Sequence, residues 1–169
     1  MQHRDFVYKW LFYAGATLLV LVIQSFLLVH IRLWGVHPFL PPVLAALVAV
    51  QEDGHESAVY AIALGVALDL TMAGPIPCFY TLACVTVMLL SRLAAGKLFS
   101  TPLLAGMVCG LFALICTDVL QMLCLAGQLS GAVFRPGALL MGKELLITAP
   151  FLLLTYVPFS RIGKMFRQE

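Results

Sequence analysis

Charged side chains are scarce in this sequence. They make up 11% of its 169 residues, whereas hydrophobic residues make up 62%. An average soluble domain is about a quarter charged. The net charge of +2, with no basic run interleaved with aromatics, argues against nucleic-acid binding. The length of 169 residues predicts a single domain, residues 1–169. The mean hydropathy of +1.02 predicts that this domain lies mostly within membrane lipid.

The motifs of common enzyme and metal sites are also missing. The sequence has no GxSxG elbow, no HExxH helix motif and no Walker A loop. Its histidines lie in the tail or in loops, and its five cysteines form no CxxC pair. We therefore expect no enzymatic activity, no cofactor and no bound metal. We interpret the cysteines as small apolar residues in helix packing.

Six apolar segments, joined by short loops, predict an all-α polytopic membrane bundle of six transmembrane helices. The predicted spans are about 10–29, 36–50, 57–73, 78–95, 103–126 and 138–158. The second is the weakest, because its apolar run 39–50 would form only about 18 Å of helix. It spans only if the preceding residues add length or if the protein surrounds it. A re-entrant segment is the alternative.

The distribution of Lys and Arg predicts that both termini are cytoplasmic. Six spans place seven basic residues inside and three outside, whereas five spans, without the second segment, give six against four. The inner set is Arg4, Lys9, Arg92, Lys97, Arg161, Lys164 and Arg167, and the outer set is Arg32, Arg135 and Lys143. We interpret the first apolar run, 11–29, as a retained span because it exceeds the roughly 7–15 residues of a signal-peptide core.

A few charged residues interrupt the apolar runs and are the first candidates for function. These residues are Asp69, Asp118, Lys143 and Glu144, and the first three are predicted to lie in the outer half of the membrane. We expect Lys143 to form an ion pair with Asp69 or Asp118, and so to join the third, fifth and sixth helices. Glu144 points about 100° away from Lys143 around a helix and needs either another neighbour or the headgroup region. A polar pocket open to the outer face is the alternative.

Small residues at four-residue spacing mark helix-packing faces. Gly106-x-x-x-Gly110 lies in the fifth segment, and Ala61-x-x-x-Gly65 lies in the third. Such spacing lets helix backbones approach closely, either within the bundle or toward a partner helix.

Residues 65–80 read GVALDLTMAGPIPCFY. In order, these residues are a glycine, three apolar residues, an aspartate at a helix end, a small-residue turn and an aromatic that opens the next helix. This pattern resembles that of the MreD family, small polytopic proteins of the bacterial rod-shape system. Pro77 stands where that family tends to have glycine, and the loop 51–56 is more acidic than expected. The positions that match the family pattern are Gly65, Asp69, Leu70, Gly74 and Pro75.

The resemblance implies a non-enzymatic subunit of the cell-elongation complex in the bacterial cytoplasmic membrane. Such a subunit would bind the single-span protein MreC. Through MreC, it would help couple the MreB cytoskeleton to the peptidoglycan polymerase and transpeptidase. The MreD fold is similar to the substrate-binding subunits of energy-coupling-factor transporters, so a vitamin-binding transporter subunit is the alternative function. Similarity in layout covers nearly the whole chain, but similarity in residues is confined mostly to 65–80.

Overall fold

The computed structural model describes residues 3–28, 35–52, 54–98, 102–128 and 134–166. Over these residues the fold is all-helical, as predicted, with loops between the helices. The elements in chain order are α1 (His3–Ile23), the short π-helix η1 (Gln24–Leu28), α2 (Pro41–Gln51), α3 (Gly54–Thr71), α4 (Phe79–Leu98), α5 (Pro102–Gln128) and α6 (Phe134–Phe166).

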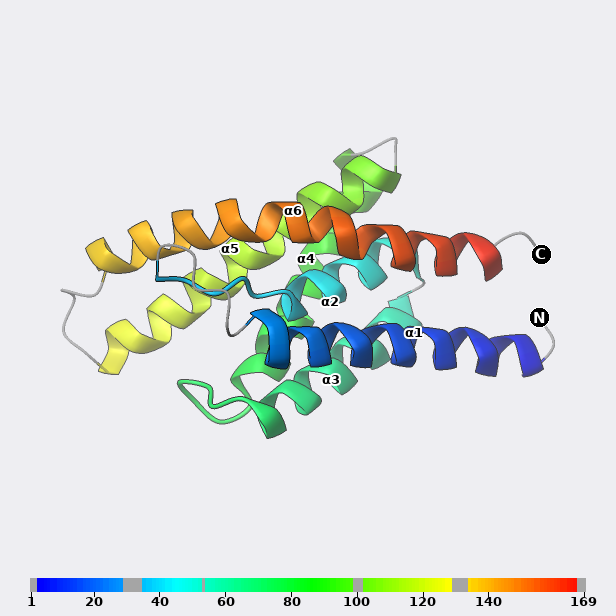
Figure 1. The fold of residues 1–169 in the computed structure, drawn as a ribbon, viewed down its shortest axis with the longest axis horizontal. Helices are drawn as coiled ribbons and strands as arrows, with labels where there is room; N and C mark the ends of the chain where they lie inside the picture. Colours follow the sequence, from blue (N-terminus) through cyan, green and yellow to red (C-terminus); the bar gives the residue numbers. More distant parts are fainter. Residues whose placement is uncertain (1–2, 29–34, 53, 99–101, 129–133, 167–169) are drawn as a thin grey trace.

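The short helix α2 lies at the centre of the bundle (Figure 1). Every residue from 41 to 49 is buried, and all five other α-helices pack against it. Pro41 and Pro42 occupy its first turn, where a missing backbone N–H costs no helical hydrogen bond. The second apolar segment is therefore short because the protein, rather than lipid, surrounds it.

The extended segment before α2 is held by the π-helix that follows α1. The buried side chain of Gln24 donates a hydrogen bond to the carbonyl oxygen of Pro38 at 2.7 Å and accepts one from the N–H of Leu40 at 3.3 Å. Buried non-helical backbone requires partners of this kind, because its polar groups cannot reach water. Figure 1 shows that this segment and α2 together lie along the middle part of the bundle, between the longer helices α1 and α6 and the rest of the ring.

Helix α6 is longer than the predicted span 138–158. It continues to Phe166 with Pro150 and Pro158 inside it. A proline removes one helical hydrogen bond and usually ends or kinks a helix. Here Phe159, directly after the second proline, is fully buried and its ring lies 5.8 Å from that of Tyr13. This packing holds the turn that the proline weakens.

Five helices form a ring around α2, and the ring is open at one place. Around it, α1 packs on α6, α6 on α5, α5 on α4 and α4 on α3. Between α1 and α3, no pair of Cα atoms in the described residues comes within 8 Å. We call this gap the α1–α3 seam. The first and last described residues lie at the same end of the bundle (Figure 1).

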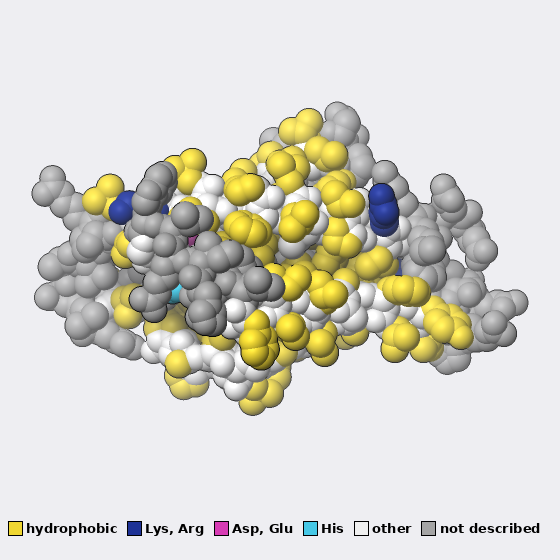
Figure 2. Space-filling model, viewed as in Figure 1, with side chains coloured by type: hydrophobic (Ala, Val, Ile, Leu, Met, Phe, Trp, Pro, Cys, Tyr) yellow, Lys and Arg dark blue, Asp and Glu magenta, His cyan; other side chains and the backbone are white. Residues whose placement is uncertain are grey.

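Hydrophobic side chains cover much of the described part of the face seen in Figure 2. Large side chains such as Leu70, Phe26 and Leu154 are 82%, 73% and 71% exposed. Three described helices are long and apolar enough to cross a membrane, with candidate spans Val7–Phe26, Leu103–Gly127 and Gly137–Ile162. Shorter apolar stretches occur at Pro41–Gln51 and Phe79–Ala95. A surface of this kind suits lipid far better than water.

Candidate functional site

The side chain of Asp69, near the end of α3, caps the first turn of α4. Its Oδ1 accepts a hydrogen bond from the N–H of Tyr80 at 2.9 Å. Its Oδ2 accepts one from the N–H of Thr81 at 3.0 Å and one from the Thr81 hydroxyl at 2.6 Å. The first N–H groups of a helix have no partner within it, and negative charge is favoured there. Asp69 therefore fastens α3 to α4.

Gly65 makes this cap possible one turn earlier on α3. A Cβ atom at this position would overlap the Cα atom of Thr81 and would lie 3.0 Å from its N atom. Residues four apart share a helix face, so Gly65 and Asp69 both face the start of α4. The spacing Gly65-x-x-x-Asp69 therefore combines close backbone approach with the hydrogen bonds that hold it.

The remaining residues of the predicted turn motif lie between α3 and α4. A Cβ atom at Gly74 would lie 3.0 Å from the Cβ atom of Phe79, so the turn folds back tightly on the start of α4. Cys78 has a φ of 59°, which is uncommon for a residue other than glycine. Pro75 is half-buried and Pro77 is exposed in the same turn.

The expected ion pair of Lys143 is not formed. Within the described part of the chain, Lys143 pairs with neither Asp69 nor Asp118. Both oxygens of Asp69 are engaged by α4 instead. Similar depth in the membrane suggested the pairing, but depth does not determine the direction in which each side chain leaves its helix.

Asp118 of α5 and Glu144 of α6 are the other two carboxyl groups that the sequence analysis predicted to lie within the membrane. Glu144 lies close enough to Asp118 for the two to interact electrostatically. The Oδ2 atom of Asp118 is buried and has no hydrogen-bond partner within the described residues. Two neighbouring carboxyl groups offer no pair of opposite charges, so they do not join helices as a Lys–Asp pair would. No group of three possible metal-ligating side chains occurs among the described residues.

The GxxxG face of α5 is filled inside the bundle. A Cβ atom at Gly106 would lie 2.7 Å from the ring of Tyr156, and one at Gly110 would lie 2.6 Å from the side chain of Leu152. Both neighbours belong to α6. Ala61 on α3 is also fully buried. Of the two predicted uses of this spacing, the structure shows packing within the bundle, and Gly106 and Gly110 are not available to a partner helix.

An ionic network lies at the end of the bundle that holds both termini. Lys9 of α1 pairs with Glu52, which follows α2, and with Glu56 of α3 at 2.7 Å. The hydroxyl of Tyr13 donates a hydrogen bond to Glu52 at 2.8 Å. Arg92 of α4 donates one to the backbone oxygen of Glu52, also at 2.8 Å. The network thus ties four helices together.

This network was not predicted from the sequence. Lys9 counted only as a cytoplasmic basic residue, yet it is 6% exposed. The acidic loop 51–56 counted only as a departure from the family pattern. A useful signal was present, because the six-span arrangement placed Lys9 and that loop on the same side of the membrane. Opposite charges at the same depth are expected to form an ion pair when both are removed from water.

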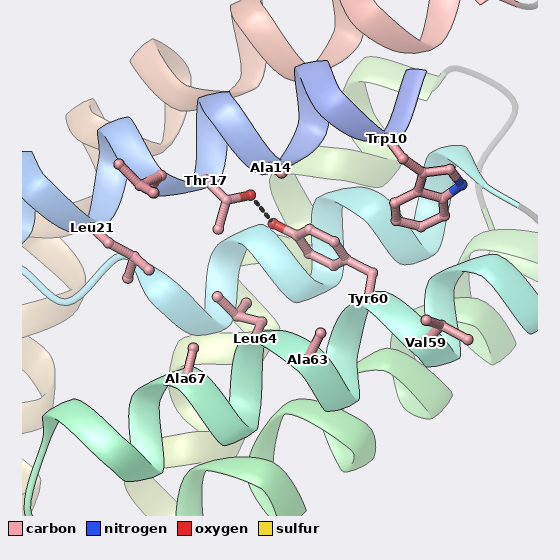
Figure 3. A pocket seen from close by; sticks show the side chains of 10 residues that line it. Trp10, Ala14, Thr17, Leu21, Val59, Tyr60, Ala63, Leu64 and Ala67 are labelled. Atoms are coloured by element: carbon pink, nitrogen blue, oxygen red, sulfur yellow. Dashed lines mark hydrogen bonds between the residues drawn. The ribbon is translucent and has the colours of Figure 1, made fainter. Parts of the chain in front are cut away.

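A groove opens along the α1–α3 seam (Figure 3). Its volume is about 320 Å³. The hydroxyl groups of Thr17 and Tyr60 are 2.6 Å apart and bond to each other across it. The rest of the lining is almost entirely apolar. The groove is lined by Trp10, Ala14, Thr17, Leu18 and Leu21 of α1 and by Val59, Tyr60, Ala63, Leu64 and Ala67 of α3.

Comparison with protein-family models, curated proteins and solved structures finds no match for this chain. Its function is therefore inferred from the geometry described above and from the resemblance at residues 65–80.

Proposed function

We propose that this chain is a non-enzymatic membrane subunit of the bacterial cell-elongation complex, similar to MreD. In this role it binds an MreC-like single-span protein and helps couple the MreB cytoskeleton to peptidoglycan synthesis. The observation that carries the proposal is the contact made by Gly65 and Asp69. The residues that resemble the family pattern have a joint physical role in joining α3 to α4, which explains why they occur at this spacing.

The arrangement of the helices supports six spans with both termini in the cytoplasm. Successive α-helices alternate in direction along the bundle, and the two termini lie at one end (Figure 1). Arg92 and Arg161 lie near the ends of α4 and α6 on that side, and Lys143 lies toward the other end. This distribution agrees with the preference of cytoplasmic loops for Lys and Arg.

A substrate-binding subunit of an energy-coupling-factor transporter is the second candidate, because a six-helix bundle would suit it as well. Two observations favour the adaptor function. Asp69 uses its carboxylate to cap α4, so it is not presented to a ligand in an outer pocket. The groove at the α1–α3 seam has an apolar lining and its two hydroxyl groups bond to each other, so it offers little to a polar vitamin.

An affinity purification tests the proposal. The tagged full-length chain is purified from native membranes in mild detergent, and the proteins that accompany it are identified by mass spectrometry. Membranes with an untagged chain serve as the control. We expect an MreC-like protein in stoichiometric amounts. Recovery of a transporter ATPase module in its place would contradict the proposal and favour the transporter subunit.

A further inference from the structure

We propose that the groove at the α1–α3 seam receives the transmembrane helix of a single-span partner, one whose cytoplasmic flank carries Lys or Arg. This inference deepens the proposed function and rests on it for the orientation of the bundle. It adds the site and the chemistry of the partner, neither of which follows from the resemblance at residues 65–80.

The first argument is the incomplete ring around α2. Four of the five neighbouring positions around the ring are closed by direct helix packing, and only α1 and α3 lack it in the described residues. At the rim of this gap, Leu18 and Val59 are both 65% exposed. A further helix laid along the seam would cover these side chains and complete the ring.

The second argument is the shape and polarity of the walls. Ala14 on one side and Ala63 and Ala67 on the other are small, and small residues let a helix backbone approach closely. The groove is too small for a whole helix, but it accepts one row of side chains from a helix lying over it. Because the Tyr60 hydroxyl bonds to that of Thr17, and Thr17 in turn donates to the backbone oxygen of Tyr13, the occupant needs no polar group at this depth.

The third argument is charge at the cytoplasmic end of the groove. Lys9 brings one positive charge to the carboxylates of Glu52 and Glu56, so these three side chains together, without Arg92, keep one negative charge in excess. The side chain of Glu56 is 28% exposed and lies one turn before Tyr60 on the same face of α3. Arg92 reaches the backbone of Glu52 from α4, which packs against α3 and not against α1.

A partly exposed carboxylate at this position attracts a Lys or Arg that follows the cytoplasmic end of a partner helix. The same carboxylate repels the phosphate of a lipid headgroup. Charge therefore favours a protein helix over a phospholipid as the occupant.

The first test fills the groove. Ala63→Phe places a ring in it, and Ala138→Phe makes the same change at an exposed position of α6. Both variants are first shown to insert and to elute as single species. We expect Ala63→Phe to reduce capture of the MreC-like protein about tenfold or more, because overpacking a contact typically costs enough for such a change. Ala138→Phe should capture normally. Normal capture by Ala63→Phe would overturn the inference.

The second test identifies the occupant in the membrane. A photo-cross-linking amino acid replaces Val59 at the rim of the groove, or Leu139 on α6 as the control, and adducts are sequenced. We expect an adduct between position 59 and the transmembrane segment of a single-span protein, with none at position 139. Reversal of the basic residues in that partner's flank should weaken the adduct several-fold. An adduct with phospholipid alone, with a second copy of this chain, or with nothing would overturn the inference.

The two proposals fail in different ways. If the unaltered chain captures an MreC-like protein and position 59 does not touch it, the proposed function stands and the groove assignment falls. If position 59 instead captures another single-span protein with a basic cytoplasmic flank, and no MreC-like protein co-purifies, the groove assignment stands and the proposed function falls.

Discussion

The two sides of helix α3 are built in different ways. Toward α4, the backbones meet directly at Gly65 and the carboxylate of Asp69 holds the contact. Toward α1, the backbones stay apart and side chains cross the gap. Lys9 pairs with Glu56, Thr17 bonds to Tyr60, and the rings of Trp10 and Tyr13 pack against the ring of Tyr60. One side is a closed contact of main chains, and the other is an open seam bridged at a few points.

This difference separates structural from binding residues on one helix. In lipid there is no hydrophobic driving force between helices, so close packing and hydrogen bonds must hold them together. The α3–α4 contact uses both, and the oxygens of Asp69 are occupied within it. The α1–α3 seam leaves small apolar side chains uncovered, which is what a further helix requires. The following predictions test each side in turn.

The largest effect on stability is expected at the ion pairs of Lys9, which cross the α1–α3 seam. Lys9→Met leaves the carboxylate of Glu52 buried without a cation, and removing one member of a buried pair costs about 3–5 kcal/mol. We expect the lower end of this range, because Glu56 is partly exposed. Thermal and denaturant unfolding in mild detergent measure the loss.

The matched control is Lys143→Met, since Lys143 forms no ion pair within the described residues. A second control replaces all three charges, with Glu52→Gln and Glu56→Gln added to Lys9→Met. This triple variant should recover part of the lost stability, because no charge is then stranded. Equal stability of Lys9→Met and Lys143→Met would contradict the role of the network.

On the α4 side of α3, a side chain added at Gly65 should disrupt the contact between the two helices. In Gly65→Val the new side chain meets backbone atoms of Thr81, which cannot move aside as a flexible side chain can. Overpacking costs about 1–3 kcal/mol, and we expect a value at the upper end. Gly142→Val on α6 is the control, since a Cβ there meets nothing within 4 Å. Both variants are compared by thermal unfolding. A neutral effect at Gly65 would show that α3 and α4 are less tightly packed than described.

Replacing Asp69 should have a smaller effect on the same contact. Asp69→Ala leaves the N–H groups of Tyr80 and Thr81 without their acceptor, at a cost of about 2 kcal/mol. Asp69→Asn keeps one acceptor oxygen and should lose about half as much. The same unfolding experiment ranks the two. A folded Asp69→Ala protein that no longer captures the MreC-like partner would contradict a purely structural role for this residue.

The smallest effect is expected at the hydroxyl pair in the groove. Thr17→Val removes the hydrogen bond to the buried Tyr60 and should cost about 1 kcal/mol. Tyr60→Phe should cost a similar amount, and the double variant should cost little more than either single one. Strict additivity in this double-mutant cycle would mean that the two hydroxyl groups do not interact.

Much of the fold was predictable because the position and length of each apolar segment can be read directly from a sequence. The helices occur near the predicted segments, and the short second segment is surrounded by protein, one of the possibilities left open for it. The extension of α6 beyond Pro158 was missed, because the burial of Phe159 depends on a distant helix. Asp69 was recognised as a helix-end residue, but its acceptance of N–H groups from α4 was not foreseen.

The candidate site was less predictable than the fold. The pairing expected for Lys143 is not formed, whereas the pairing of Lys9 was not anticipated. Both outcomes depend on the direction in which a charged side chain leaves its helix. The groove could not be predicted from the sequence either. Its alanines are spread over two helices, and they resemble any other small residues in a membrane segment.

By itself, the sequence determined the apolar helices, the tight turn after α3 and the chemistry available at residues 65–80. Only the tertiary structure decided that Gly106 and Gly110 face α6, that Lys9 meets two carboxylates and that α1 and α3 leave a seam. The physical reason is that helices in lipid are apolar on every side, so their sequence pattern carries little information about which face meets which neighbour. Packing and a few buried hydrogen bonds make that choice.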